Sequence, residues 1–248
     1  MCSKSFNNIL GEVENLNEQI KYFEEVTLPE LEKQGKNSSR ESVSKYLFVV
    51  GSGGKNHTSN YFLNRSRSNI SSHAFTDNLI TTLSSQVKKL YNLGAKNFVI
   101  MSLYPLGCNP RSLAAQPQKK GCNKSLNDAA MDFNYYLKSL VKRLKPEMPG
   151  SNFVIVNAYK IIEDIIKNPT SRGFTDTTQP CCEPSKEEKG NWILCKKGGS
   201  TCEDRNKHVY FDDLHSTEAV NVALATAGYS SEFASEVYPF NIWELAQI

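Results

Sequence analysis

Three short runs of apolar residues divide the chain, and each has the length of a buried strand. They predict strands at roughly 46–50, 97–101 and 152–156. The runs are continuous. A strand with one solvent-exposed face would instead alternate apolar and polar residues. Because parallel strands are covered by helices on both faces, such runs favour a parallel sheet.

Amphipathic helices are predicted between these strands, at 74–93 and 124–145. The first ends at Gly94, a residue typical of helix C-caps, and the second stops before Pro146. Strand, helix, strand, helix and strand in succession predict βαβ units, with the sheet covered by helices. Apolar residues recur at helical spacing at Phe75, Leu79, Leu83, Val87 and Leu90, and at Ala130, Phe133, Leu137, Val141 and Leu144.

Further segments are predicted to pack around this central unit. An amphipathic packing helix is expected over 6–25, followed after Pro29 by a surface segment or a second short helix. Helices are also predicted at 159–167 and at 217–227, the latter closed by Gly228, and the C-terminal tail is expected to dock on the body. Residues 170–207 lack periodicity and are predicted to form a long loop held by disulfides.

Composition fits one α/β domain that spans residues 1–248. The chain is 39% hydrophobic and 22% charged, and its net charge of +3 is too dispersed for a nucleic-acid site. The sequence contains no run of 18 apolar residues, so it predicts no transmembrane helix. The N-terminus lacks the apolar region of a signal peptide.

Cysteines and glycosylation motifs nevertheless favour an oxidising, secretory environment. Five of the seven cysteines lie between residues 122 and 202. A composition typical of secreted proteins, in a chain without a recognisable signal peptide, indicates that an N-terminal part is missing. Asn-x-Ser/Thr motifs begin at Asn37, Asn56, Asn64, Asn69 and Asn123.

The strongest candidate for chemistry is the segment from Val209 to Ala219. A short apolar run ends in Asp212 and Asp213, and His215 follows three residues after the first carboxylate. In a tight turn, Asp212 can orient and stabilise the His215 imidazole, as the acid and base of a catalytic triad require. Ser216 or Thr217 is the predicted N-cap of the next helix, with Glu218 in its first turn. Alone, D-x-x-H is more often an ordinary helix entry than a catalytic pair.

Several motifs occur along the chain in a characteristic order and spacing. They are KYLFVVGSGG at 45–54, NYFL at 60–63, GAKNFVI at 94–100, PLGCNP at 105–110, GFT at 173–175, Cys181-Cys182 and FDDLHSTEA at 211–219. With these motifs the chain resembles the plant GDSL esterase/lipases of the SGNH hydrolase superfamily, from about residue 5 to the last residue.

The resemblance implies a three-layer flavodoxin-like SGNH hydrolase fold with a parallel sheet, here missing its N-terminal strands. It implies a serine esterase site at the carboxyl edge of the sheet, an acyl ester or lipid substrate, and no cofactor. In that site His215 is the general base and Asp212 its orienting acid. Asp213 is then the intervening, solvated residue. The family and the composition together imply a secreted or endomembrane location.

Two departures from the family concern catalysis. The family nucleophile lies in a Gly-Asp-Ser block, and this chain contains no Gly-Asp-Ser and no G-x-S-x-G elbow. Where the family reads Gly-Asn-Asp, this chain reads Gly54-Lys55-Asn56, so Lys55 replaces the oxyanion asparagine. Gly54 and Asn56 remain the candidate oxyanion donors. Ser52 is the one serine predicted at the catalytic edge, although a small residue in a tight loop is its simpler interpretation.

The cysteines and histidines complete the predicted chemistry. Cys108 and Cys122 can form one disulfide, and the four later cysteines can form two more in any connectivity, with Cys2 left over. No metal is assigned, because the other histidines lack ligand-like spacing, at His57, His73 and His208.

Three functional hypotheses follow from the sequence. The first is a carboxylic ester hydrolase that uses a Ser–His–Asp relay. The second is a catalytically inactive relative kept as a binding or assembly protein of the secretory pathway. The third is a truncated product that does not fold stably, because the loss of a central strand exposes backbone hydrogen-bonding groups.

Overall fold

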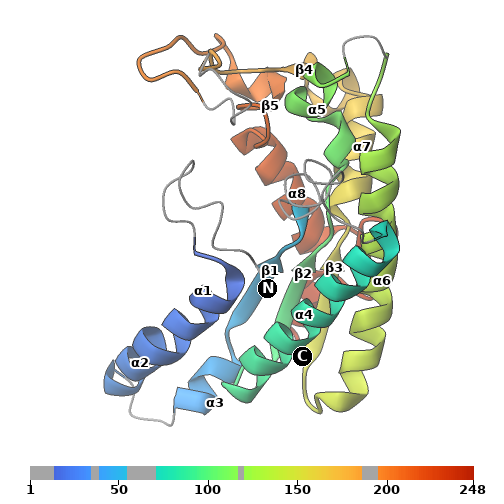
Figure 1. The fold of residues 1–248 in the computed structure, drawn as a ribbon. Coiled ribbons are helices and arrows are strands. Elements are labelled where there is room, and N and C mark those ends of the chain that lie inside the picture. Colours follow the sequence, from blue (N-terminus) through green and yellow to red (C-terminus); the bar gives the residue numbers. More distant parts are fainter. Residues whose placement is uncertain (1–13, 35–38, 55–70, 117–119, 186–194) are drawn as a thin grey trace.

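A mainly parallel sheet with helices on both faces forms the centre of the molecule (Figure 1). The structure is a computed structural model that describes residues 14–34, 39–54, 71–116, 120–185 and 195–248. Its central sheet has the strand order β1-β2-β3-β6. The strands are β1 (Leu47–Gly51), β2 (Asn97–Met101), β3 (Asn152–Val156) and β6 (Val237–Tyr238).

The three predicted strands are adjacent and parallel, as expected. Phe98 in β2 lies opposite Phe48 in β1 and Phe153 in β3, and neither interface is shifted in register. The rings of Phe98 and Phe153 are stacked with centroids 5.1 Å apart. The short strand β6 pairs antiparallel with β3, which attaches the C-terminal tail to the sheet edge. The predicted docking of the tail is therefore confirmed.

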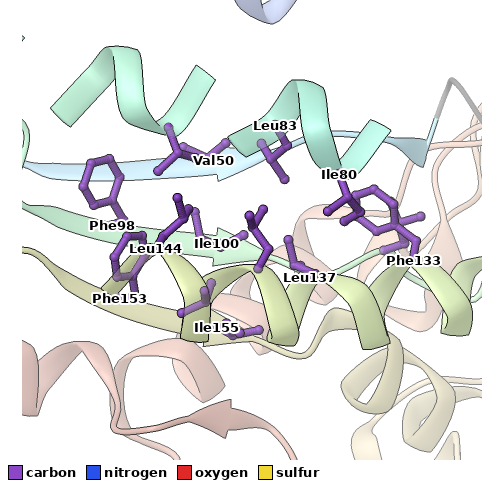
Figure 2. Close-up of a cluster of buried hydrophobic side chains, with 14 of the residues drawn as sticks. Val50, Ile80, Leu83, Phe98, Ile100, Phe133, Leu137, Leu144, Phe153 and Ile155 are labelled. Atoms are coloured by element: carbon purple, nitrogen blue, oxygen red, sulfur yellow. The ribbon is translucent and has the colours of Figure 1, made fainter. Parts of the chain in front are cut away.

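One face of the sheet is covered by α4 (Ser72–Asn92) and α6 (Lys124–Glu147). Leu83 from α4 and Leu137 from α6 meet Ile100 of the sheet in a buried cluster (Figure 2). Asn side chains start α6 and the neighbouring α5 (Pro110–Ala114), because Asn123 and Asn109 accept hydrogen bonds from backbone N–H groups of the first turns.

The opposite face is covered by α7 (Ala158–Lys167), α8 (Glu218–Ser230) and α9 (Ile242–Leu245). Val99 and Val154 point into this second core, whereas their neighbours Phe98 and Phe153 point into the first. The strands are buried on both faces at these positions, which explains why their sequences read as continuous apolar runs.

The N-terminal helix differs from its prediction at both ends. Residues 6–13 lie outside the described part, and helix α1 (Leu16–Tyr22) begins after Asn15, whose side chain and that of Glu18 form a capping box. The helix then continues through a π-helical turn, Phe23–Thr27, into α2 (Leu28–Gln34). A further helix, α3 (Ser39–Ser44), precedes β1. The alternative of a short helix after Pro29 was therefore the better one.

Two other predictions were wrong in detail. Helix α8 does not end at Gly228 but runs to Ser230, because Gly228 is a packing residue. A Cβ atom at Gly228 would lie 3.1 Å from Val156 Cγ2, so the glycine lets the helix approach β3 closely. The predicted loop 170–207 contains β4 (Asp176–Pro180), which pairs in parallel with β5 (His208–Tyr210) to form a second small sheet.

No described helix is both long enough and apolar enough to cross a membrane.

Gly53 offers a test of the backbone after β1. Its φ of 109° lies in the region that favours glycine, and an added Cβ would lie 3.1 Å from Phe133 Cζ. We expect Gly53→Ala to lower the free energy of unfolding by about 1–3 kcal/mol through backbone strain, plus the clash with the ring. Denaturant unfolding measures the change.

The matched control is Gly150→Ala. Gly150 also has a positive φ, of 75°, but nothing lies within 4 Å of its added Cβ. Equal losses in the two variants would show that the Phe133 contact is not a constraint.

Candidate active site

A tight turn directly after β5 carries the candidate acid and base. The backbone N–H of Phe211 donates to the carbonyl of His215 at 2.8 Å, which closes the turn. Inside it, Asp212 Oδ1 accepts the N–H groups of Leu214 and His215, at 2.8 and 2.7 Å. The side chain of Asp212 therefore builds the turn that positions His215.

The predicted hydrogen bond between the two side chains is present. Asp212 Oδ2 lies 2.7 Å from His215 Nδ1. The Asp212 side chain is 12% exposed, whereas that of His215 is 72% exposed. A buried carboxylate thus holds an accessible imidazole. With Nδ1 protonated toward Asp212, Nε2 is the nitrogen that can accept a proton.

The pKa of Asp212 is lowered and the pKa of His215 is raised. Burial alone raises the pKa of Asp212, but the hydrogen bonds from the His215 side chain and from two backbone N–H groups outweigh burial and lower it. The hydrogen bond to Asp212 raises the pKa of His215, against a smaller opposing effect of burial. The arrangement stabilises the imidazolium that forms when His215 takes up a proton.

Tyr104 lies between this pair and the loop after β1, because it interacts with the charge of Asp212 and neighbours Gly54. The sequence did not single out this residue. Burial, followed by the negative charge of Asp212, raises the pKa of Tyr104 to about 12. Its Cε1 atom lies 4.0 Å from the position of a Cβ on Gly54. Tyr104 follows β2 and Gly54 follows β1, so the carboxyl ends of both strands converge near Asp212, as open α/β geometry predicts. Its position three residues after a predicted strand was the available signal.

Asp213 is buried, so the prediction of a solvated residue was wrong. Its exposed fraction is 6%, and its Oδ2 atom has no hydrogen-bond partner in the described part of the chain. Burial and then the charge of Asp212 raise the pKa of Asp213, while the charge of Arg111 lowers it. Helix α5 lies against this part of the turn, since the N–H of Arg111 donates to the carbonyl of Asp213.

Of the other predicted site residues, the structure describes Gly54 and Ser52. Both follow β1, but Ser52 makes no hydrogen bond with His215 among the interactions of the described chain. Asn56, Lys55 and His57 lie outside the described residues. The predicted groove that joins His215 to residues 51–57 therefore stays a prediction.

Ser102 is a second serine at the carboxyl end of a strand, directly after β2. It is 7% exposed, and its Oγ accepts the N–H of Tyr159 at the start of α7. Ser102 therefore has a structural role at the entry to this helix.

The helix after the turn begins at the predicted place, with Thr217 as N-cap and Glu218 in its first turn. The Thr217 side chain does not cap the helix. Its hydroxyl instead donates to the carbonyl of His208, which ties α8 to β5.

Three disulfides surround this part of the molecule. The predicted Cys108–Cys122 bond is present, and the open connectivity is resolved as Cys181–Cys202 and Cys182–Cys195. The N–H groups of Cys181 and Cys182 donate to the carbonyls of Tyr210 and Phe211, so the disulfide-linked loop extends along β5 up to the turn. Cys2 lies outside the described residues. In the described part, no three His, Cys, Asp or Glu side chains form a group that could hold a metal ion.

The fold and the pair together define a class of protein. It is an α/β protein with a carboxylate–imidazole pair of the kind that orients a general base, placed where loops leave a mainly parallel sheet.

Comparison with known proteins identifies the family. The family model of GDSL-like lipase/acylhydrolases matches residues 6–227. The chain is 36% identical over 211 residues to GDSL esterase/lipase At1g29670 of Arabidopsis thaliana, which covers 83% of this chain and 57% of the relative. It is 31% identical over 242 residues to At1g29660 of the same plant, covering 96% of this chain and 64% of the relative. The chain belongs to the GDSL esterase/lipase family, and it spans about three fifths of the length of these relatives.

Replacing Asp212 tests the coupling of the pair. In Asp212→Asn, an amide oxygen can still accept the two backbone N–H groups, but the negative charge is lost. We expect the pKa of His215 to fall toward the ordinary value of about 6.5. A proton NMR titration of the His215 ring measures it, with Asp132→Asn on the exposed side of α6 as the control. An unchanged His215 pKa would contradict the coupling.

The same variant has a pH-dependent effect on stability. The raised pKa of His215 contributes stability at acidic pH that is lost as pH rises through it, and the lowered pKa of Asp212 contributes stability that is lost as pH falls through it. The deficit of Asp212→Asn should therefore be largest near pH 5, between the two ordinary values of about 3.9 and 6.5. Because His215 is exposed, we expect no more than about 1 kcal/mol. Thermal melts at pH 5 and pH 9 test this, and a larger deficit at pH 9 would contradict it.

Proposed function

We propose that this chain carries the acid–base half of a GDSL-type carboxylic ester hydrolase. The observation that carries the proposal is the 2.7 Å hydrogen bond between Asp212 and His215, in a chain of this family. In this function His215 Nε2 takes the proton of an attacking serine and later returns it to the leaving alcohol. Asp212 fixes the ring orientation and stabilises its charged form. The substrate class is an acyl ester or lipid, as the family name implies.

We further propose that the chain by itself has no more than trace activity. The 248 residues contain no Gly-Asp-Ser, and Lys55 replaces the family's oxyanion asparagine. Loss of one oxyanion donor typically costs about 10²–10³ in rate, and loss of the nucleophile leaves only the modest enhancement of the remaining site. The backbone N–H of Gly54 and the side chain of Asn56 are the candidate oxyanion donors that remain.

The exposed side of β1 supports the proposal that strands of the family fold are missing. Within the described residues, β1 has a neighbouring strand on one side only. Val49 and Leu47 are 63% and 42% exposed, although Val99 beside Val49 is fully covered by the second core. An open edge with exposed apolar residues is the place where a further strand can pair.

A catalytically inactive binding or assembly protein is the second candidate, and the missing Gly-Asp-Ser favours it. This candidate requires a stable fold and a protein partner but no ester hydrolysis. For either candidate we propose a secreted or endomembrane location, which the three disulfides support.

The first test is hydrolysis of p-nitrophenyl butyrate by the purified chain, together with labelling by a serine-reactive fluorophosphonate. We expect trace hydrolysis at most and no labelling. If the chain hydrolyses the ester and His215→Ala does not, one of its own serines is the nucleophile. Ser52→Ala then tests the first suspect. A cooperative thermal melt of the inactive chain separates the binding protein from an unstable truncated product.

A complementation experiment tests the half-site directly. We expect that co-expression with an N-terminal segment of a family member, carrying the Gly-Asp-Ser block, raises hydrolysis at least about tenfold, because each missing catalytic group costs more than that. The gain should disappear with His215→Ala in this chain and with alanine at the added serine. A gain that survives His215→Ala would assign the activity to the added segment alone.

A further inference from the structure

A cavity of about 1000 Å³ lies beside the turn that carries the acid–base pair. Its walls come from α5, the end of α7, strand β4 and the disulfide-linked loops that follow it. Figure 1 shows α5, β4 and β5 gathered at the same end of the molecule. Its volume is at the upper end of the range for small-molecule sites, about 300–1,000 Å³.

The walls are largely apolar, and disulfide bonds cross-link the loops that contribute to them. Leu113 of α5, Ile166 of α7 and Pro180 of β4 are among the apolar lining residues. Cysteines of all three disulfides line it, namely Cys108, Cys122, Cys181, Cys182 and Cys202. A largely apolar cavity of this kind suits a hydrocarbon chain.

Two carboxylates line the cavity, and they differ in their partners. Glu183 is held by Lys196 Nζ at 2.8 Å and by the N–H of Ser200 at 3.1 Å. Asp213 is buried, and its Oδ2 atom has no hydrogen-bond partner in the described chain. Arg111 interacts electrostatically with Asp213 but is not among the lining residues that the structure describes. Asp213 is therefore the lining carboxylate whose negative charge is not hydrogen-bonded to a cationic side chain in the described chain.

We propose that this cavity binds the hydrocarbon part of an uncharged single-chain amphiphile, and that the Asp213 carboxylate selects against fatty-acid anions. An uncharged ligand meets no repulsion from the Asp213 carboxylate, whereas a ligand carboxylate placed beside it meets a like charge. Asp212, the residue before Asp213 in the turn, is hydrogen-bonded to His215, so the cavity adjoins the turn that carries the acid–base pair.

This inference rests on the proposed function only in naming the ligand as the apolar part of an ester substrate. In that setting Asp213 also disfavours the fatty acid that hydrolysis would produce. Binding can be measured without any hydrolysis, so a failure of either proposal is distinguishable from a failure of the other.

The test is calorimetric titration of the whole chain with 1-decanol and with decanoate at pH 8, below their aggregation concentrations. We expect decanol to bind and decanoate to bind more weakly. Asp213→Asn should tighten decanoate binding by about tenfold and change decanol binding by less than about twofold, because only the anion meets the lost charge. Asp132→Asn, which removes an exposed carboxylate on α6, should change neither.

Filling the cavity provides the positional control. Leu113→Trp should abolish binding of both ligands while the thermal melt stays cooperative, and Ala114→Trp serves if the first variant does not fold. No binding of either ligand to the wild-type chain would overturn the proposal. So would binding that the tryptophan variants leave intact, or an Asp213→Asn variant that prefers decanol to decanoate as strongly as the wild type.

Discussion

The unshifted parallel pairing of β1, β2 and β3 is the constraint on which the rest of the structure depends. Because Phe48, Phe98 and Phe153 share one level of the sheet, their side chains enter the same core between the sheet and helices α4 and α6. Val99 in β2 and Val154 in β3, which follow these phenylalanines directly, enter the opposite core. A one-residue slip would exchange the two sets and disrupt both cores at once. The same pairing aligns the carboxyl ends of the strands, where Tyr104 lies beside Gly54 and feels the negative charge of Asp212.

The candidate site combines this rigid sheet with a second, smaller unit. Strands β4 and β5 pair outside the central sheet, and the disulfide-linked loop extends that pairing up to the turn at Asp212. Two adjacent carboxylates then have different tasks. Asp212 receives three hydrogen bonds and is stabilised as an anion, whereas Asp213 is buried beside a cavity without an equivalent set of donors. Hydrogen bonding, and not burial alone, separates their pKa values.

Local patterns along the chain determined the central sheet, its two main helices and the Asp212–His215 hydrogen bond. Apolar runs predict buried strands because both faces of a parallel strand must avoid water, and a three-residue spacing in a turn is short enough to fix the pair. The membership of the family was also readable from motifs in sequence order. An error arose at Gly228, where the local pattern was misleading. Glycine is typical of a helix end, but this glycine packs against Val156 inside the helix.

Only the tertiary structure decided what depends on contacts between distant segments. The pairing of the four later cysteines follows from how their loops fold onto β5, which spacing along the chain does not specify. Asp213 is buried where its carbonyl accepts the N–H of Arg111 in α5, about a hundred residues away in sequence. Tyr104 gained its place beside Asp212 through the convergence of strand ends. The sequence by itself therefore determined the sheet and the Asp212–His215 pair, and the packing of remote segments decided the surroundings in which that pair lies.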